Sequence, residues 1–264
     1  KAHLVPHDSR FTTRNFRSHW HTVEEQCVGP YVFGKDHLDL IHIPYVTIPI
    51  LYTGKMVVTI HDLTLLQEKT GKASTLPAPL YKLKHQALRT VLSVGLRNTS
   101  GVICVSHATE DAVTRQYPFL QGRTTVIYEG VDETLQSTVQ LHDDAPRITG
   151  PYFLCVGNAY PHKNLDMLIT AFSAWKSQNP SRKDTLVFVG PDDYFYRLLQ
   201  KKYIDLLEAH QITIIHNVTD PMLASLYHHA RCLVFPSISE GFGLPALEAV
   251  AAGIPLFVSD IPVF

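Results

Sequence analysis

Short apolar runs alternate with longer, helix-patterned segments through the second half of the chain. Nearly every residue of each run is apolar, as in strands that are covered on both faces of a parallel sheet. Between the runs, apolar side chains recur at steps of three and four residues, which indicates amphipathic helices. This alternation predicts a parallel sheet with right-handed crossovers. The expected strands are 152–156, 185–189, 212–215, 232–235 and 255–258, and the expected helical segments are 164–178, 192–210, 220–230 and 244–252.

The first half shows the same pattern less clearly. Its expected strands are 40–43, 56–60, 102–105 and 125–128, and its expected helices are 79–97 and 107–116, with Ser106 as N-cap of the latter. No element is predicted for 1–35. The stretch 138–150 loses apolar periodicity, so we predict a linker between a first domain at 1–137 and a second domain at 151–264. The expected fold class is α/β, with two Rossmann-like parallel-sheet domains facing a cleft.

Composition narrows the possible partners. The net charge of −1 argues against a nucleic-acid polymer, and the 45% hydrophobic content argues against disorder. No apolar run reaches the roughly 20 residues that a membrane span needs, and no signal-peptide core occupies the first 26 residues. Cys27, Cys104, Cys155 and Cys232 are too far apart for a Cys-x-x-Cys unit. We therefore expect a soluble chain in a reducing compartment, the cytoplasm.

The segment after strand 232–235 carries the strongest ligand signal. Ligands of parallel sheets bind beyond the carboxyl ends of the strands. Here a turn containing Gly241 and Gly243 leads into a helix with Pro245 in its first turn. Glycines allow close approach to the backbone, and a helix N-terminus presents free N–H donors to an anion. The segment therefore predicts a phosphate-binding turn.

Two glutamates flank this turn. Glu248 lies in an alanine-rich helix, where an ionised carboxylate is costly without hydrogen-bond donors. The hydroxyls of a ribose or hexose would supply such donors. The alternatives are a helix-dipole or salt-bridge role for Glu248 and an ordinary turn role for Glu240.

Two further basic groups follow strands. Lys163, after the Gly157 turn, lies at the start of a predicted helix, where its charge opposes the helix dipole unless an anion binds. It is a candidate diphosphate ligand, and the alternative is a solvated surface lysine. His61 ends strand 56–60 and could donate to a phosphate or a sugar hydroxyl, or be a core histidine bound to backbone. No histidine pair with a nearby carboxylate suggests zinc, so no metal is expected.

The predicted helix 79–97 carries Lys82, Lys84, Arg89 and Arg97. A basic amphipathic helix can touch an anionic membrane surface, which would place the protein at the inner face of a membrane. The alternative is an ordinary solvated face above a buried apolar stripe that includes Leu80, Leu83 and Val94.

Taken together, these motifs resemble the retaining glycosyltransferases of family four (group 1), which have the GT-B fold. The resemblance lies in Gly157-Asn158 followed by His162-Lys163-Asn164, and in Glu-Gly-Phe-Gly-Leu-Pro from Glu240, with seven residues between Glu240 and Glu248. First-domain segments at Ile60-His-Asp, 102–106 and 126–132 are also similar to the family. The resemblance covers nearly the whole chain from about residue 38.

The family implies transfer of a hexose from a nucleoside-diphosphate sugar to a saccharide or lipid-linked acceptor, with retention of configuration and no metal or other cofactor. It implies that His61, Lys163 and Glu240 are the catalytic residues, with His61 beside the transferred sugar and Glu240 on the donor-sugar hydroxyls. Glu248 would bind the ribose, and Lys163 with the backbone amides of Gly243 and Leu244 would bind the diphosphate. The remaining donor-binding positions would be Gly157, Asn158, Gly241 and Phe242. The asparagine form at 158 resembles mannosyltransferase-like members and points to GDP-mannose.

Family members begin with a strand and glycine-rich loop and continue through more sheet, so we expect both domains to be incomplete. Two alternatives stay open. One is a fragmentary GT-B scaffold that only binds a nucleotide or a partner. The other is an NAD-type oxidoreductase, because Gly241, Gly243 and Ala246 fit G-x-G-x-x-A and Asp260 follows 19 residues after Gly241. Against it, five residues separate Phe235 from Gly241, whereas that motif places glycine directly after the strand.

Overall fold

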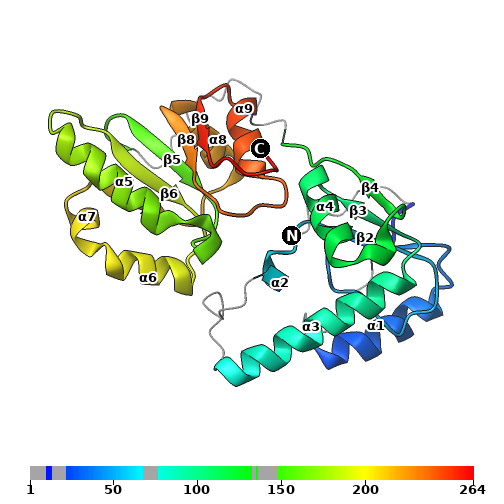
Figure 1. Cartoon of the computed structure of the whole chain (residues 1–264). Helices are drawn as coiled ribbons and strands as arrows, with labels where there is room; N and C mark the ends of the chain where they lie inside the picture. Colours follow the sequence, from blue (N-terminus) through cyan, green and yellow to red (C-terminus); the bar gives the residue numbers. More distant parts are fainter. Residues whose placement is uncertain (1–9, 14–21, 68–76, 133–134, 136–147) are drawn as a thin grey trace.

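The computed structural model describes residues 10–13, 22–67, 77–132, 135 and 148–264, which form two separate parallel sheets (Figure 1). The first sheet has the strand order β1 (Ile41–Ile43), β2 (Met56–Ile60), β3 (Gly101–Cys104), β4 (Thr124–Val126). The second has the order β7 (Ile212–Ile215), β6 (Thr185–Val189), β5 (Tyr152–Val156), β8 (Cys232–Phe235), β9 (Leu256–Val258). Every strand pair is parallel. The α/β class with two Rossmann-like sheets is therefore confirmed.

Helices follow the strands of both sheets. The first sheet is accompanied by α1 (Val23–Lys35), α2 (Thr64–Gln67), α3 (Ala78–Asn98), α4 (His107–Gln116) and the 3-10 turn η2 (Pro118–Leu120). The second is accompanied by η4 (Pro161–Lys163), α5 (Leu165–Gln178), α6 (Tyr194–Lys202), α7 (Ile204–Glu208), α8 (Asp220–His229) and α9 (Leu244–Ala251). The single helical segment expected over 192–210 is thus two helices. The first ends because the backbone at Tyr203 leaves the helical region.

The helix α1 has no counterpart in the sequence expectations. Its N-cap is Thr22, whose hydroxyl accepts a hydrogen bond from the Glu25 N–H, and Pro30 lies inside it. Proline in a helix interior is a breaking signal, so local sequence rules argue against this helix. Of the predicted linker, residues 138–147 lie outside the described part, and the domain bounds stay predictions.

Apolar side chains are buried on both faces of the second sheet. One cluster joins the sheet to α8 and α9 through Leu154, Leu233 and Tyr227. The other joins it to α5 and α6 through Phe188 and Ile169. All five residues of β6 are buried, which explains why its sequence is apolar throughout instead of alternating.

The helix α3 packs on the first sheet with a different face from the one expected. Its buried side chains are Leu92 and Leu96. Leu80, Leu83 and Val94, assigned to the buried stripe, are 50%, 68% and 40% exposed. The expectation was wrong because helical spacing identifies a stripe of apolar residues but not which part of a long helix reaches the core. Nowhere in the described ranges is a helix both long and apolar enough to span a bilayer.

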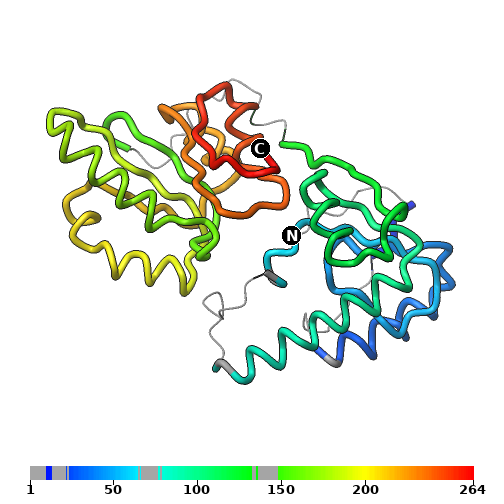
Figure 2. Tube along the Cα trace, viewed as in Figure 1, coloured from blue at the N-terminus to red at the C-terminus, as the bar shows by residue number. Residues whose placement is uncertain are grey.

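The loop between β8 and α9 is one place where the two halves of the molecule meet. The orange segment between β8 and α9 leaves the second sheet and reaches toward α4 of the first half (Figure 2). Because the strands of each sheet are parallel, residues that follow β2 and β3 lie at the same sheet edge. His61 and Ser106, which follow these two strands, both lie at this contact.

Candidate functional site

Lys163 and Glu240 form a buried ion pair. The Lys163 Nζ lies 2.5 Å from Glu240 Oε1, and the two side chains are only 12% and 11% exposed. The ammonium also lies 5.0 Å from the centre of the Phe235 ring. The backbone supports the pair, because the Ile238 N–H donates to the carbonyl of His162, joining the loops that carry the two residues. Paired in this way, both groups can stay charged away from water.

The position of Lys163 differs from the expectation. It is the last residue of η4, and Asn164 follows with φ 56° in the left-handed region before α5 begins at Leu165. The charge of Lys163 is balanced within the chain by Glu240, whereas we expected a bound anion to balance it. An ammonium has three N–H donors, and the contact with Glu240 uses one of them.

Glu248 has a neutral partner. The Tyr227 hydroxyl donates to Glu248 Oε2 at 2.6 Å, and the Tyr227 side chain is fully buried. Burial raises the pKa of the Glu248 carboxyl, the Tyr227 hydrogen bond acts in the opposite direction, and the charge of Asp220 adds to the rise. Burial also raises the pKa of Tyr227, so this phenol stays a donor. Tyr227 was missed, although a tyrosine in an apolar helix signals a hydroxyl that needs a partner.

The helix α9 begins without a side-chain cap. Its N-cap is Gly243, with φ 91°, a conformation that L side chains rarely adopt. The first residue of α9 is Leu244, and no side chain bonds the N–H groups of this first turn as a cap. The Phe264 ring lies against Gly243, where a Cβ would come 2.4 Å from it. Pro245 has no N–H and the Ala246 N–H donates to the Gly243 carbonyl, so in this turn the Leu244 N–H is left for an anion, and the cap position is restricted to glycine.

The Gly157 turn holds the loop that precedes Lys163. The Gly157 N–H donates to Val189 O, and its carbonyl accepts from the Tyr196 hydroxyl at 2.9 Å. Asn158 Oδ1 accepts from the Tyr160 N–H at 3.2 Å. Asn158 therefore shapes its own turn through one side-chain atom, and its donor-binding role stays a prediction.

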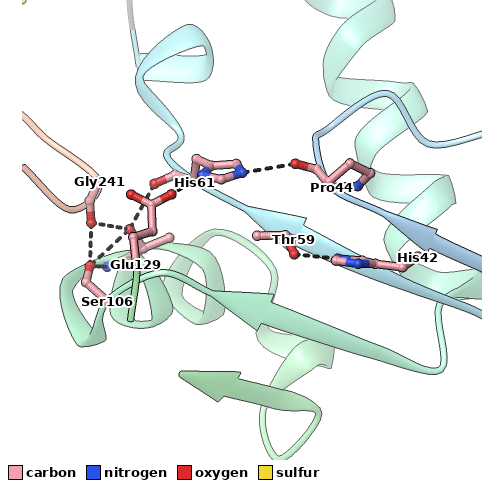
Figure 3. Close-up of polar contacts among 8 residues, drawn as sticks. His42, Pro44, Thr59, His61, Ser106, Glu129 and Gly241 are labelled. Carbon is pink, nitrogen blue, oxygen red and sulfur yellow. Dashed lines mark hydrogen bonds and ion pairs between the residues drawn. The ribbon is translucent and has the colours of Figure 1, made fainter. Parts of the chain in front are cut away.

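Gly241 is one of the points at which the second half touches the first. Its carbonyl accepts hydrogen bonds from Ser106 Oγ at 2.5 Å and Thr109 Oγ1 at 2.9 Å (Figure 3). A Cβ at residue 241 would lie 1.7 Å from the carbonyl oxygen of His61, so the contact requires glycine. The next residue, Phe242, has its ring 6.0 Å from that of Tyr128 in the first half. Ser106 also caps α4, accepting from the Thr109 N–H as expected.

His61 lies beside this contact with both ring nitrogens engaged. Nδ1 is 2.6 Å from Glu129 Oε1, and Nε2 is 3.0 Å from the carbonyl of Pro44 (Figure 3). The Pro44 carbonyl can only accept, so the ring donates to it through Nε2, and Nδ1 is held by the Glu129 carboxyl. Glu129 was missed as a partner, although it lies within the 126–132 segment that resembles the family. A sugar hydroxyl would reach a ring nitrogen only by replacing one of these acceptors.

Two other features of the described residues bear on ligands. No group of three or more His, Cys, Asp or Glu side chains among them could hold a metal ion. A separate groove between η4, α5 and α6 is lined by Tyr160, Phe195 and their neighbours, and none of the predicted donor-binding residues lines it. The predicted residues that the structure brings together are thus Lys163 with Glu240, and His61 with Gly241.

Comparison with known proteins identifies the family. Residues 5–135 match the model described as Glycosyltransferase Family 4, and residues 141–264 match Glycosyl transferases group 1. The chain belongs to this glycosyltransferase family. Its similarity to the O-antigen chain mannosyltransferase RfbU of Salmonella typhimurium is 31% identity over 209 residues, which covers 78% of this chain and 56% of that protein. A serotype-specific mannosyltransferase of Escherichia coli, WbdA, is 32% identical over 122 residues, covering 46% of this chain and 15% of that protein.

Solved structures agree on the GT-B fold of the family. HepE of Anabaena, solved with UDP and glucose, has a TM-score of 0.67 at 18% identity, covering 93% of this chain and 66% of that one. Sucrose-phosphate synthase of Thermosynechococcus elongatus has a TM-score of 0.66 at 23% identity, covering 88% and 58%. This chain therefore spans a little over half the length of several family members that it matches.

Proposed function

We propose that this chain transfers a hexose from a nucleoside-diphosphate sugar to a hydroxyl of a saccharide or lipid-linked acceptor, with retention of configuration. The observation that carries the proposal is the buried Lys163–Glu240 pair next to the uncapped N-terminus of α9. A cation and free backbone donors suit a diphosphate, and a carboxylate suits sugar hydroxyls. The mannosyltransferase names of RfbU and WbdA support mannose as the hexose, and with Asn158 they favour GDP-mannose as the donor.

In the proposed reaction, the acceptor oxygen bonds to the anomeric carbon on the face from which the diphosphate leaves. The bond from that carbon to the phosphate oxygen breaks, and the acceptor proton passes to the departing phosphate. The products are a glycoside and a nucleoside diphosphate. The remaining N–H donors of Lys163 and the backbone amides of Gly243 and Leu244 at the start of α9 would stabilise the charge that grows on the diphosphate. No resident metal or cofactor is part of the proposal.

The two glutamates would hold different parts of the donor. Glu240 already has one oxygen on Lys163, so it would place a sugar hydroxyl close to the ammonium that binds the diphosphate. Glu248 has one oxygen on Tyr227, so its other oxygen would accept from a ribose hydroxyl. His61, on the first half, would face the transferred sugar across the contact at Gly241.

The experiment is a binding and turnover panel. Calorimetry with GDP-mannose, UDP-glucose and NAD measures donor choice, and release of GDP with and without mannose acceptors measures transfer and donor hydrolysis. We expect the tightest binding with GDP-mannose and a loss of binding in Lys163→Ala. The matched control is Lys202→Ala, because Lys202 forms an exposed ion pair with Asp166 in the same half.

Each outcome separates one alternative. Preferential binding of NAD would favour the oxidoreductase and overturn the proposal. Nucleotide binding without transfer or donor hydrolysis would favour a scaffold. Equal loss of binding in Lys163→Ala and Lys202→Ala would show that the effect is not specific to the pair with Glu240.

We also propose that α3 brings the enzyme to an anionic membrane face, at the inner side of a membrane, where a lipid-linked acceptor would lie. Leu80 and Leu83 are exposed next to the exposed Lys82 and Lys84, a combination that suits acidic headgroups above acyl chains. Co-sedimentation with phosphatidylglycerol-containing vesicles should exceed that with phosphatidylcholine vesicles. Lys82→Glu with Lys84→Glu should abolish the difference.

The matched control for that experiment is Lys201→Glu with Lys202→Glu, since both lysines are exposed on α6 of the other half. If this control loses vesicle binding to the same extent, net charge and not α3 would be responsible.

A further inference from the structure

The carbonyl of Gly241 is held from the other half of the molecule by two buried hydroxyls. Ser106 and Thr109 are 5% and 4% exposed, and both direct their hydroxyl oxygens at this carbonyl (Figure 3). Each hydroxyl has one proton to donate, and for both of them the Gly241 carbonyl is the nearer acceptor: Ser106 Oγ lies 3.2 Å from Thr109 Oγ1 but 2.5 Å from this carbonyl. The Thr109 hydroxyl also lies 3.3 Å from the carbonyl of His61. The Thr109 hydroxyl thus contacts both His61, which follows β2 in the first half, and Gly241, in the loop between β8 and α9.

The held carbonyl is directly next to Glu240 in the chain. Glu240 pairs with Lys163 on its own half, and the following residue is fixed by the first half. Since Gly241 has no Cβ, its backbone packs on His61 more closely than any other residue allows. The position of the Glu240 carboxylate therefore depends on contacts from both halves.

We propose that Ser106 and Thr109 are positioning residues, which hold the Gly241 carbonyl and thereby set the Glu240 carboxylate for the donor sugar. The inference rests on the proposed function for the identity of the donor. Its consequence is a coupling: a donor that binds Glu240 in this arrangement strengthens the contact between the halves, and the contact strengthens donor binding by the same factor.

The two hydroxyls differ in how cleanly they can be tested. Ser106 also caps α4, so its removal changes helix stability together with the contact. Thr109 lies inside α4, and Thr109→Val replaces a hydroxyl with a methyl of similar size. Thr109→Ser keeps the hydroxyl, so its KM should stay near that of the wild type. The matched control is Thr114→Val on the same helix, because the Thr114 hydroxyl bonds back to carbonyls of that helix, those of Glu110 and Asp111.

The first measurement is the split between KM and kcat. Thr109→Val should raise the KM for GDP-mannose about tenfold, the value of one hydrogen bond, with a smaller effect on kcat. Thr109→Ser and Thr114→Val should stay near wild type. A simple loss of folded protein would lower the apparent kcat and leave KM unchanged, so the two causes give different results.

The second measurement needs no donor. Cys27 is exposed, whereas Cys104, Cys155 and Cys232 are buried, so Cys27 and an introduced Gln178→Cys label the two halves selectively. Energy transfer between the labels should fall in Thr109→Val, as the halves separate more often. It should not change in Thr114→Val.

Unchanged energy transfer and unchanged KM in a folded Thr109→Val would overturn the inference, and so would equal changes in Thr114→Val. If the wild type binds no nucleotide sugar at all, the proposed function fails. The energy-transfer result would then still decide whether the two hydroxyls hold the halves together, because it is measured without donor.

Discussion

The loop that carries Glu240 and the helix that carries Glu248 place the two glutamates of one motif in opposite electrostatic surroundings. Glu240 faces the ammonium of Lys163 at 2.5 Å, whereas Glu248 accepts from the neutral Tyr227 hydroxyl at 2.6 Å. Burial raises the pKa of Glu248, and no cation is paired with it among the described residues. The spacing of a motif therefore does not define the charge state or task of its members. Their partners do.

The largest effect is expected from removing the cation. Lys163→Ala leaves the Glu240 carboxylate buried without a partner, which costs about 3–5 kcal/mol of stability for a buried pair. Urea denaturation measures the change in the free energy of unfolding. Lys163→Met with Glu240→Gln, which removes both charges, should recover most of it. If the single and double variants lost the same stability, the pair would not be the cause.

The next effect concerns the loop alone. Gly241→Ala places a Cβ 1.7 Å from the His61 carbonyl, so the loop must shift and Glu240 with it, while Glu248 on α9 keeps its place. We expect kcat/KM for GDP-mannose to fall about 100-fold, as for a displaced reacting group. The affinity for GDP, which lacks the sugar, should change little. Equal losses for GDP and GDP-mannose would contradict the division of tasks between the two glutamates.

A smaller effect is expected at the helix. Tyr227→Phe removes the donor to Glu248 and leaves a buried acceptor without that bond, at a cost of about 1–3 kcal/mol. The free energy of unfolding should therefore fall less than in Lys163→Ala, and GDP affinity should fall with it. Tyr152→Phe, which removes another buried tyrosine hydroxyl, from the Leu226 carbonyl, should leave GDP affinity near wild type.

The smallest effect is a pH dependence. The pKa of Glu248 is higher in the folded protein than in the unfolded chain, so folding favours the protonated carboxyl. This contribution is fully present below the unfolded pKa and is lost as pH rises through the folded pKa. Glu248→Gln has no carboxyl at this position, so its free energy of unfolding does not show this decrease with pH. Its stability relative to wild type should rise across the mildly acidic range and then level off, as denaturant midpoints from pH 4 to pH 8 would show.

Most of the second sheet could be predicted from local sequence, and most site partners could not. The strands 152–156, 185–189, 212–215 and 232–235 agree residue by residue with the structure, because burial on both faces makes a strand apolar throughout. The helix α1 could not be found, since Pro30 is a local signal against it. A pattern confined to neighbours cannot predict such a contact-stabilised helix.

The same limit applies to the site. Glycine and glutamate spacing indicated where ligands would bind, but Lys163 and Glu240 are 77 residues apart, and His61 and Glu129 are 68 apart. Three bonds exist only because the fold brings distant segments together. Tyr227 bonds Glu248, Glu129 bonds His61, and Ser106 bonds the Gly241 carbonyl in addition to capping α4. Sequence patterns identified one member of each pair, such as Glu248 and His61, while tertiary structure supplied the partners Tyr227 and Glu129.

The acceptor that joins the two halves is a peptide carbonyl, which every amino acid provides. No substitution in the loop can delete it, and residue 241 is restricted only by the space that a side chain would need. As long as residue 241 stays glycine, the side chains that set the strength of this hydrogen bonding are therefore the hydroxyls of Ser106 and Thr109 in the first half. A homologue could retune how firmly its halves hold together, through helix α4 alone, without any change to the residues that bind its donor.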